Sequence, residues 1–152
     1  MKLYLVSVPM VAYYAKKVGI ELSRINVMGT YLDFTKAKRG HRRKNQKYIQ
    51  CIKQFKSFML DSGAFTFFKK DRTSLQNFDW FSYVDEYAEF IQENAIDLFF
   101  QLDLGKVIGL EKERKLLEYL NKKAGKQCIP VYHPYLHSRD YFMSLVNEYK
   151  YV

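Results

Sequence analysis

The sequence SFMLDSG, residues 57–63, combines a strand pattern with a turn. It opens with three successive apolar residues after Ser57, as in strands that are buried on both faces of a parallel sheet. Asp61 stands where this strand gives way to a turn, and Gly63 lets the backbone approach a ligand closely. The stretch therefore predicts a buried strand with a carboxylate at its carboxyl end.

On both sides of this segment, similar apolar runs predict five further strands. They cover residues 2–9, 25–32, 96–103, 127–133 and 149–152. Helical patterns fill the connections at residues 10–22, 36–56, 79–94, 110–123 and 138–146. The clearest helix is residues 79–94, where apolar residues recur at i, i+3, i+4 and i+7. Strands that alternate with helices favour a parallel sheet with right-handed crossovers.

This alternation predicts an α/β fold, namely a partial TIM-type (β/α) barrel of about five to six strands. We expect residues 1–152 to form a single α/β domain, equivalent to the N-terminal part of a (β/α)8 barrel. A complete barrel needs about 250 residues. Three outcomes stay open: an open doubly wound sheet, two copies that pair their edges, or a second polypeptide that completes the barrel.

Composition excludes several classes of protein. Apolar residues make up 48% of the chain and aromatic residues 17%, which is enough for a core and argues against disorder. Cys51 and Cys128 lie far apart, so a disulfide scaffold or a structural zinc site is not expected. No stretch approaches the roughly 20 apolar residues of a membrane span. We expect a cytoplasmic protein with no cofactor and no metal.

The net charge of +9 is concentrated in one segment. Nine basic residues and no acidic ones lie between Phe34 and Leu60. Such a density of like charge is typical of a surface that faces a polyanion, although a solvated helix face is the simpler alternative. A membrane surface is disfavoured because the segment lacks an apolar stripe. The residues expected to contact a nucleic-acid backbone are Lys38, Arg39, Arg42, Arg43, Lys44 and Lys47.

Ligands of parallel α/β folds bind at the carboxyl ends of the strands. Asp61, Asp103 and His133 each end or follow a predicted strand. A strand-end aspartate can also serve solely as a helix cap, and this alternative stays open for both Asp61 and Asp103. We expect the two carboxylates to face one pocket. Divalent-metal hydrolysis by the same three residues is a further alternative, although their spacing is not diagnostic.

Residues 58–65, FMLDSGAF, resemble the DSGGFQ strand-end motif of the tRNA-guanine transglycosylases. They are closer still to the LDSGAF form of bacterial and phage relatives that insert 7-deazaguanine bases into DNA. The strand that ends at Asp103 resembles the next acidic strand of that family, and residues 129–134 fall where the family has its next base-pocket loop. In strand order the resemblance spans about residues 3–152.

The resemblance implies roles for individual residues. Asp61 would transfer a proton and contact the heterocycle, and Asp103 would bind the edge of the base. Ser62 and Gly63 would shape the pocket with their backbone N–H groups. The other residues expected at the base are Phe65, Gln101, Tyr132 and His133.

The implied reaction is a base exchange at C1′ of a nucleotide in DNA or tRNA, catalysed by a glycosyltransferase. In the family the nucleophilic aspartate comes from a later strand and a zinc site follows it. The implied protein is therefore incomplete alone, and we expect a second chain or self-association to complete it. The alternative is a non-catalytic nucleic-acid-binding α/β module.

Overall fold

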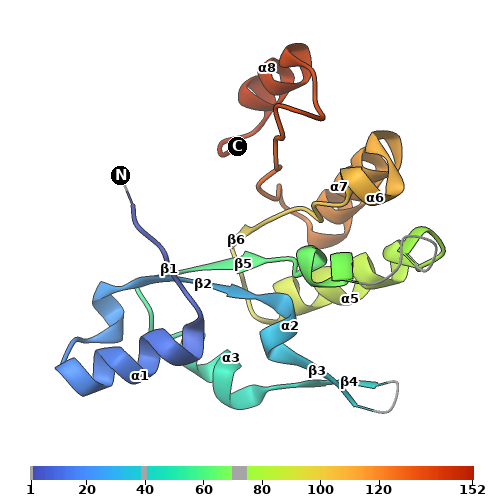
Figure 1. The fold of residues 1–152 in the computed structure, drawn as a ribbon. Coiled ribbons are helices and arrows are strands. Elements are labelled where there is room, and N and C mark those ends of the chain that lie inside the picture. Colours follow the sequence, from blue (N-terminus) through green and yellow to red (C-terminus); the bar gives the residue numbers. More distant parts are fainter. Residues whose placement is uncertain (1, 39–40, 70–74) are drawn as a thin grey trace. The chain divides into compact units, whose positions relative to one another are not determined.

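The computed structural model describes residues 2–38, 41–69 and 75–152, which Figure 1 draws as a ribbon. They divide into two compact units. The first holds residues 1–61 and 96–98, and the second holds residues 62–95 and 99–152. That the whole chain forms a single domain stays a prediction. Among the described residues, no helix is both long enough and apolar enough to cross a membrane.

A parallel sheet carries the fold. Its strands follow the order β1-β2-β5-β6, with bounds Leu5–Val6, Asn26–Thr30, Ser57–Asp61 and Leu98–Phe99. β2 pairs in parallel with both β1 and β5, and its register places Thr30 beside Asp61. The predicted α/β class with a parallel sheet is therefore confirmed, and Asp61 ends its strand as the sequence indicates.

Several strands are shorter than predicted. The first ends at Val6, because Ser7 takes a positive φ of 75° and a helix begins directly after it, with proline in its first turn. Residues 127–133 contribute only a parallel bridge between Ile129 and Phe100. Residues 149–152 were predicted to be a strand, and this is wrong: they are irregular, with Tyr149 half-buried and the last three residues exposed. A barrel of five to six strands stays a prediction.

α1 (Val8–Val18) packs on β2 in the first unit. A Cβ at Gly29 would lie 2.9 Å from Val8 Cγ2 and 3.1 Å from a ring carbon of Phe34, so the close approach of helix and strand requires glycine there. α1 ends at Gly19, which adopts the left-handed conformation with φ 72°. Shorter helices in this unit are the 3₁₀ helix Leu22–Arg24, α2 (Tyr31–Phe34) and α3 (Gln46–Ile52).

Much of the basic segment forms a β-hairpin, so the helix predicted over residues 36–56 is wrong in its first half. β3 (Thr35–Lys38) and β4 (His41–Lys44) pair antiparallel, as Figure 1 shows. The backbone N–H of Asn45 donates to the carbonyl of Phe34 at 2.7 Å and closes the base of the hairpin. Residues 39–40 lie outside the described residues.

The hairpin has a physical reason in the sequence. In a helix, Lys38 and Arg42 would stand one turn apart, and like charges at that spacing destabilise a helix. Gly40 favours a turn between the two basic runs. Only residues 46–52, where apolar side chains recur at helical spacing, form the helix.

Helices dominate the second unit. Those among the described residues include the 3₁₀ helix Ala64–Lys69, α5 (Trp80–Glu93), α6 (Gly105–Ile108), α7 (Leu110–Ala124) and α8 (Arg139–Glu148). The predicted helices at 79–94, 110–123 and 138–146 are confirmed. Asp79 caps α5 by accepting from the Ser82 N–H, and Ser138 caps α8 in the same way. Gly125 ends α7 in the left-handed conformation.

An aromatic cluster forms part of the core of the second unit. It consists of Phe67, Phe78, Trp80 and Tyr83, with ring centroids between 4.6 and 6.3 Å apart. Trp80 is fully buried, and its indole N–H donates to the carbonyl of Leu75 at 2.9 Å. The high aromatic content of the chain therefore serves packing here, and the cluster supports the turn that follows β5.

Candidate functional site at the strand ends

The turn after β5 is held rigidly. The hydroxyl of Tyr83 in α5 donates to the carbonyl of Ser62 at 2.6 Å. Ser62 is buried, and its Oγ accepts from the N–H of Ala64 at 3.4 Å. Gly63 has a φ of 76°, which a residue with a side chain adopts only with strain. The DSG motif is thus a preformed turn in which Ser62 packs inward.

Phe65 is the exposed aromatic residue of this turn. Phe65 is 74% exposed, so it is not part of the core. An exposed ring beside a strand end is available to a planar ligand. Contact between Phe65 and the base stays a prediction.

Two extended segments run side by side beyond β6. The N–H of Ile129 donates to Phe99 O at 2.7 Å, and the N–H of Gln101 donates to Ile129 O at 3.0 Å. Because the pairing is parallel, residues that follow the two segments reach the same edge. This pairing brings together Asp103 and His133, as the sequence predicts.

Asp103 and His133 form a direct pair. His133 Nε2 lies 2.8 Å from Asp103 Oδ1, and the side chains of Asp103 and His133 are 35% and 34% exposed. The pair is therefore accessible to a ligand. A carboxylate beside an imidazole can accept hydrogen bonds from a ligand and can take part in proton transfer.

A second carboxylate and imidazole lie behind the first pair. Glu113, in the first turn of α7, is 4% exposed, and its Oε1 accepts from the N–H groups of Leu104 and Gly105 at 2.8 and 2.7 Å. Its other oxygen, Oε2, lies 3.4 Å from Nε2 of the buried His137. Glu113 thus holds the two peptide groups that directly follow Asp103.

The two imidazoles are joined through the backbone. The N–H of His133 donates to His137 Nδ1 at 3.0 Å, and the N–H of His137 donates to the carbonyl of His133 at 2.9 Å. Their rings stack at 22° with centroids 6.1 Å apart. A connected series of groups therefore runs from Asp103 through His133 and His137 to Glu113, and we call it the Asp103–Glu113 network.

One buried acceptor lies close to this network in the sequence. Gln101 is 2% exposed, and within the described residues its Oε1 has no hydrogen-bond partner. A buried polar atom without a partner costs free energy and commonly marks a place where a ligand or water binds. In the first unit, Thr30 is paired with Asp61 in the strand register. Its hydroxyl is also buried, and within the described residues it has no hydrogen-bond partner.

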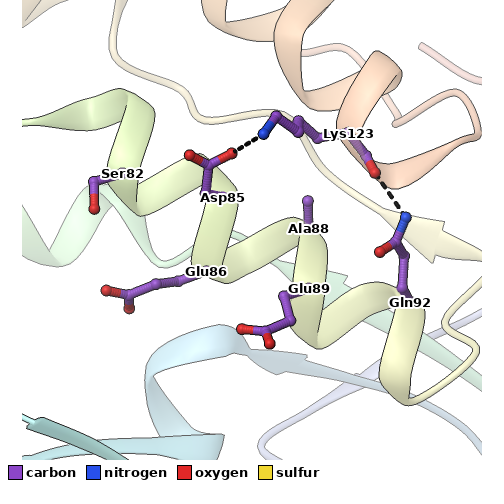
Figure 2. Close-up of a pocket in the computed structure, with 7 residues that line it drawn as sticks. All are labelled: Ser82, Asp85, Glu86, Ala88, Glu89, Gln92 and Lys123. Atoms are coloured by element: carbon purple, nitrogen blue, oxygen red, sulfur yellow. Dashed lines mark hydrogen bonds and ion pairs between the residues drawn. The ribbon is translucent and has the colours of Figure 1, made fainter.

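A groove of about 470 Å³ borders the network. It is lined by Leu110, Glu111, Arg114, Leu136, His137, Ser138 and Tyr141. A separate groove of about 360 Å³ lies along α5, and Figure 2 shows its lining residues. There Lys123 pairs with Asp85 at 2.8 Å, and Glu86 and Glu89 point away from this contact. Its acidic lining repels phosphate, so we do not assign it to a nucleic acid.

The other predicted site residues are divided between the two units. Asp61 belongs to the first unit and Asp103 to the second, so a pocket shared by both stays a prediction. Tyr132 is half-buried and stacks on His137, with centroids 5.7 Å apart. Lys38, Arg42, Arg43 and Lys44 lie on the hairpin strands, Lys47 is exposed on α3, and Arg39 lies outside the described residues.

Glu113 and His137 were not predicted. Glu113 sits in the charged run EKERK, which is typical of a solvated helix face. The missed signal is its position: residues 113, 116, 117, 120 and 124 form the buried stripe of α7. A glutamate on an apolar stripe indicates a buried carboxylate with a structural or functional partner.

Burial makes the stability of this site depend on pH. Burial raises the pKa of Glu113 above its ordinary value of 4.5. This effect outweighs the hydrogen bonds from the two backbone N–H groups, which lower the pKa. The folded chain therefore keeps this proton at a pH where the unfolded chain has lost it. We expect the contribution of Glu113 to the free energy of unfolding to fall as pH rises from about 4.5 through the folded pKa.

Urea denaturation of the wild type and of Glu113→Gln between pH 4 and 8 measures this dependence. The wild type is expected to lose stability relative to the variant as pH rises, because only the wild type carries the ionisable carboxyl. A difference between the two that stays constant over this range would show that Glu113 titrates alike in both states.

Taken together, the fold and the site define an α/β protein with a carboxylate–imidazole pair beyond parallel strand ends. No protein-family model, no curated protein and no solved structure matches the chain.

Proposed function

We propose that this chain is a transglycosylase-like protein that exchanges guanine for a 7-deazaguanine base in DNA or tRNA. It acts in the cytoplasm as part of a TIM-type barrel that a second chain or a second copy completes. The observation that carries the proposal is the accessible Asp103–His133 pair, two residues beyond the unpaired acceptor of Gln101.

Guanine fits this set of acceptors. Its pairing edge presents two adjacent donors, the N1–H and the 2-amino group, and carboxylate and amide oxygens accept such donors. With Oδ1 of Asp103 engaged by His133, the described residues leave Oδ2 for the base. Gln101 Oε1 is a further acceptor that needs a donor. Adenine presents an acceptor at N1 and fits this set poorly.

The base exchange conserves atoms and electrons without a cofactor. A carboxylate attacks C1′, the bond from C1′ to N9 of guanine breaks, and the departing base takes the electron pair and a proton. The incoming 7-deazaguanine gives up a proton at N9 and forms the new bond to C1′ as the carboxylate leaves. Asp61 takes the proton-transfer role that the motif at residues 58–65 implies, and the nucleophile comes from the completing chain.

The edge of the sheet in the first unit supports a completing chain. β1 is the outermost strand, and an edge strand offers its free backbone groups to another strand. Beside it lies a groove of about 400 Å³, lined by Leu5, Val6, Met10, Val11, Tyr14, Ala15, Val18, Ile20 and Ile25. An apolar groove next to a strand edge suits an added βα unit.

A labelled-base assay tests the proposal. The protein is mixed with guanine-containing single-stranded DNA, duplex DNA or tRNA and with labelled guanine or 7-deazaguanine, alone and with a candidate completing chain. We expect label to enter one nucleic acid, and we expect Asp61→Asn to abolish its entry. No incorporation in either combination, together with no binding of guanine, would reject the proposal.

The basic hairpin favours a second candidate, a nucleic-acid-binding module without catalysis. Both strands of the hairpin carry basic residues and no acidic ones, and such a concentration of charge is typical of a surface that faces a polyanion. A two-stranded ribbon also fits the major groove of DNA. Both candidates require binding of a nucleic acid, and they differ in whether Asp61 matters.

Salt dependence of oligonucleotide binding tests the role of the hairpin. Replacing Arg42, Arg43 and Lys44 with alanine is expected to make the slope of log K against log salt less steep by up to about 2.7, at about 0.9 per phosphate contact. The matched control replaces Lys16, Lys17 and Arg24, which are exposed elsewhere in the same unit. Equal slope changes in both triple variants would show that only net charge matters.

A further inference from the structure

Glu113 anchors the backbone on the carboxyl side of Asp103. One oxygen accepts from two consecutive peptide N–H groups, those of Leu104 and Gly105. The room for this contact exists because residue 105 is glycine: a Cβ there would lie 2.7 Å from Glu113 Oε2 and 2.9 Å from Leu110 Cδ2. The position of the Asp103 backbone is therefore tied to the carboxylate of Glu113.

The hydrogen bonds also fix where His137 carries its proton. Nδ1 of His137 accepts from the N–H of His133, so the neutral ring holds its proton on Nε2. That nitrogen lies 3.4 Å from Glu113 Oε2, so its proton faces an acceptor oxygen of the carboxyl group. A proton on Nδ1 would oppose the N–H of His133 and break the contact.

Aromatic rings hold His137 in place. Tyr132 stacks on it at 28°, and Tyr141 lies against it with ring centroids 4.8 Å apart. Because the ring is confined, a change at Glu113 cannot be absorbed by free rotation of His137 and passes to the turn that carries His133. The inner pair is thus coupled to the outer pair through one backbone N–H.

We infer that Glu113 and His137 are positioning residues that hold Asp103 and His133 in the arrangement that binds the base. The inference rests on the proposed function for the identity of the ligand. The coupling itself is a property of the chain and is measurable without any ligand.

Glu113→Gln separates the two tasks of the carboxylate. The amide oxygen still accepts from Leu104 and Gly105, but the amide N–H₂ faces the Nε2–H of His137, donor against donor. We expect His137 to move its proton to Nδ1 and to lose the bond from His133. The control is Glu111→Gln, because Glu111 lies two residues earlier on α7 and is exposed.

Long-range ¹H–¹⁵N spectra of the histidine rings provide the readout. In the wild type and in Glu111→Gln, His137 is expected to carry its proton on Nε2; in Glu113→Gln its ring signals should change to the other tautomer and those of His133 should shift. Guanine affinity should fall about tenfold in Glu113→Gln alone, the size found when groups that orient metal ligands are removed.

The outcomes separate the two ideas. Unchanged His133 and His137 signals in a folded Glu113→Gln protein would overturn the coupling, regardless of the affinity for guanine. Shifted ring signals with an unchanged guanine affinity would also overturn the positioning role. If wild-type protein binds no guanine while the ring signals shift as expected, the proposed function fails and the coupling stands.

Discussion

Replacing Asp103 with asparagine is expected to weaken guanine binding about 100-fold. The substituted side chain keeps its shape and an oxygen for His133, so the fold should survive. Its amide N–H₂, however, replaces the oxygen that accepts from guanine, and two donors then face each other. The loss corresponds to about 2.8 kcal/mol of binding free energy, within the range for a hydrogen bond to a charged group.

Equilibrium dialysis with labelled guanine measures this effect. The matched control is Asp140→Asn, an exposed carboxyl in the first turn of α8 that should leave the affinity unchanged. Thermal unfolding of both variants checks that the fold is retained. If Asp103→Asn binds guanine as tightly as the wild type does, Asp103 does not read the base.

Replacing Trp80 with alanine is expected to lower the free energy of unfolding by about 3–5 kcal/mol. Trp80 is fully buried within the aromatic cluster and contacts the rings of Phe67, Phe78 and Tyr83. Its removal leaves a cavity and deprives the buried carbonyl of Leu75 of its donor. Since many small domains are stable by only about 5–15 kcal/mol, this loss is a large fraction of the total stability.

Urea denaturation followed by far-UV circular dichroism tests this prediction. The control is Phe81→Ala, because the next ring along α5 is 39% exposed and lies against Tyr119. We expect the control to cost about 1 kcal/mol or less. Equal losses from the two substitutions would show that the cluster does not organise the second unit.

The sequence predicts best where one local rule decides the structure. α5 and α7 follow from helical spacing together with a capping Asp79 and a terminal Gly125, and the structure confirms both. The strand ending at Asp61 follows from its apolar run. The helix predicted over the basic segment is wrong in its first half, because like charges one turn apart oppose a helix and residues 35–38 pair with residues 41–44 instead.

The candidate site was predicted in part. Asp103 and His133 could be paired in advance because parallel strands deliver their carboxyl ends to one edge. Glu113 and His137 could not, because their partners come from a helix and a turn whose packing no local pattern specifies. The identity of a ligand likewise depends on acceptors that only the folded chain leaves unpaired, such as Gln101 Oε1.

The most direct test of base recognition by Asp103 and His133 is a titration of ¹⁵N-histidine-labelled protein with guanine and, separately, with adenine. Guanine is expected to shift the ring signals of His133 in a saturable manner, and adenine should leave them in place. Identical responses to the two bases, or no response of His133 to guanine, would contradict the account.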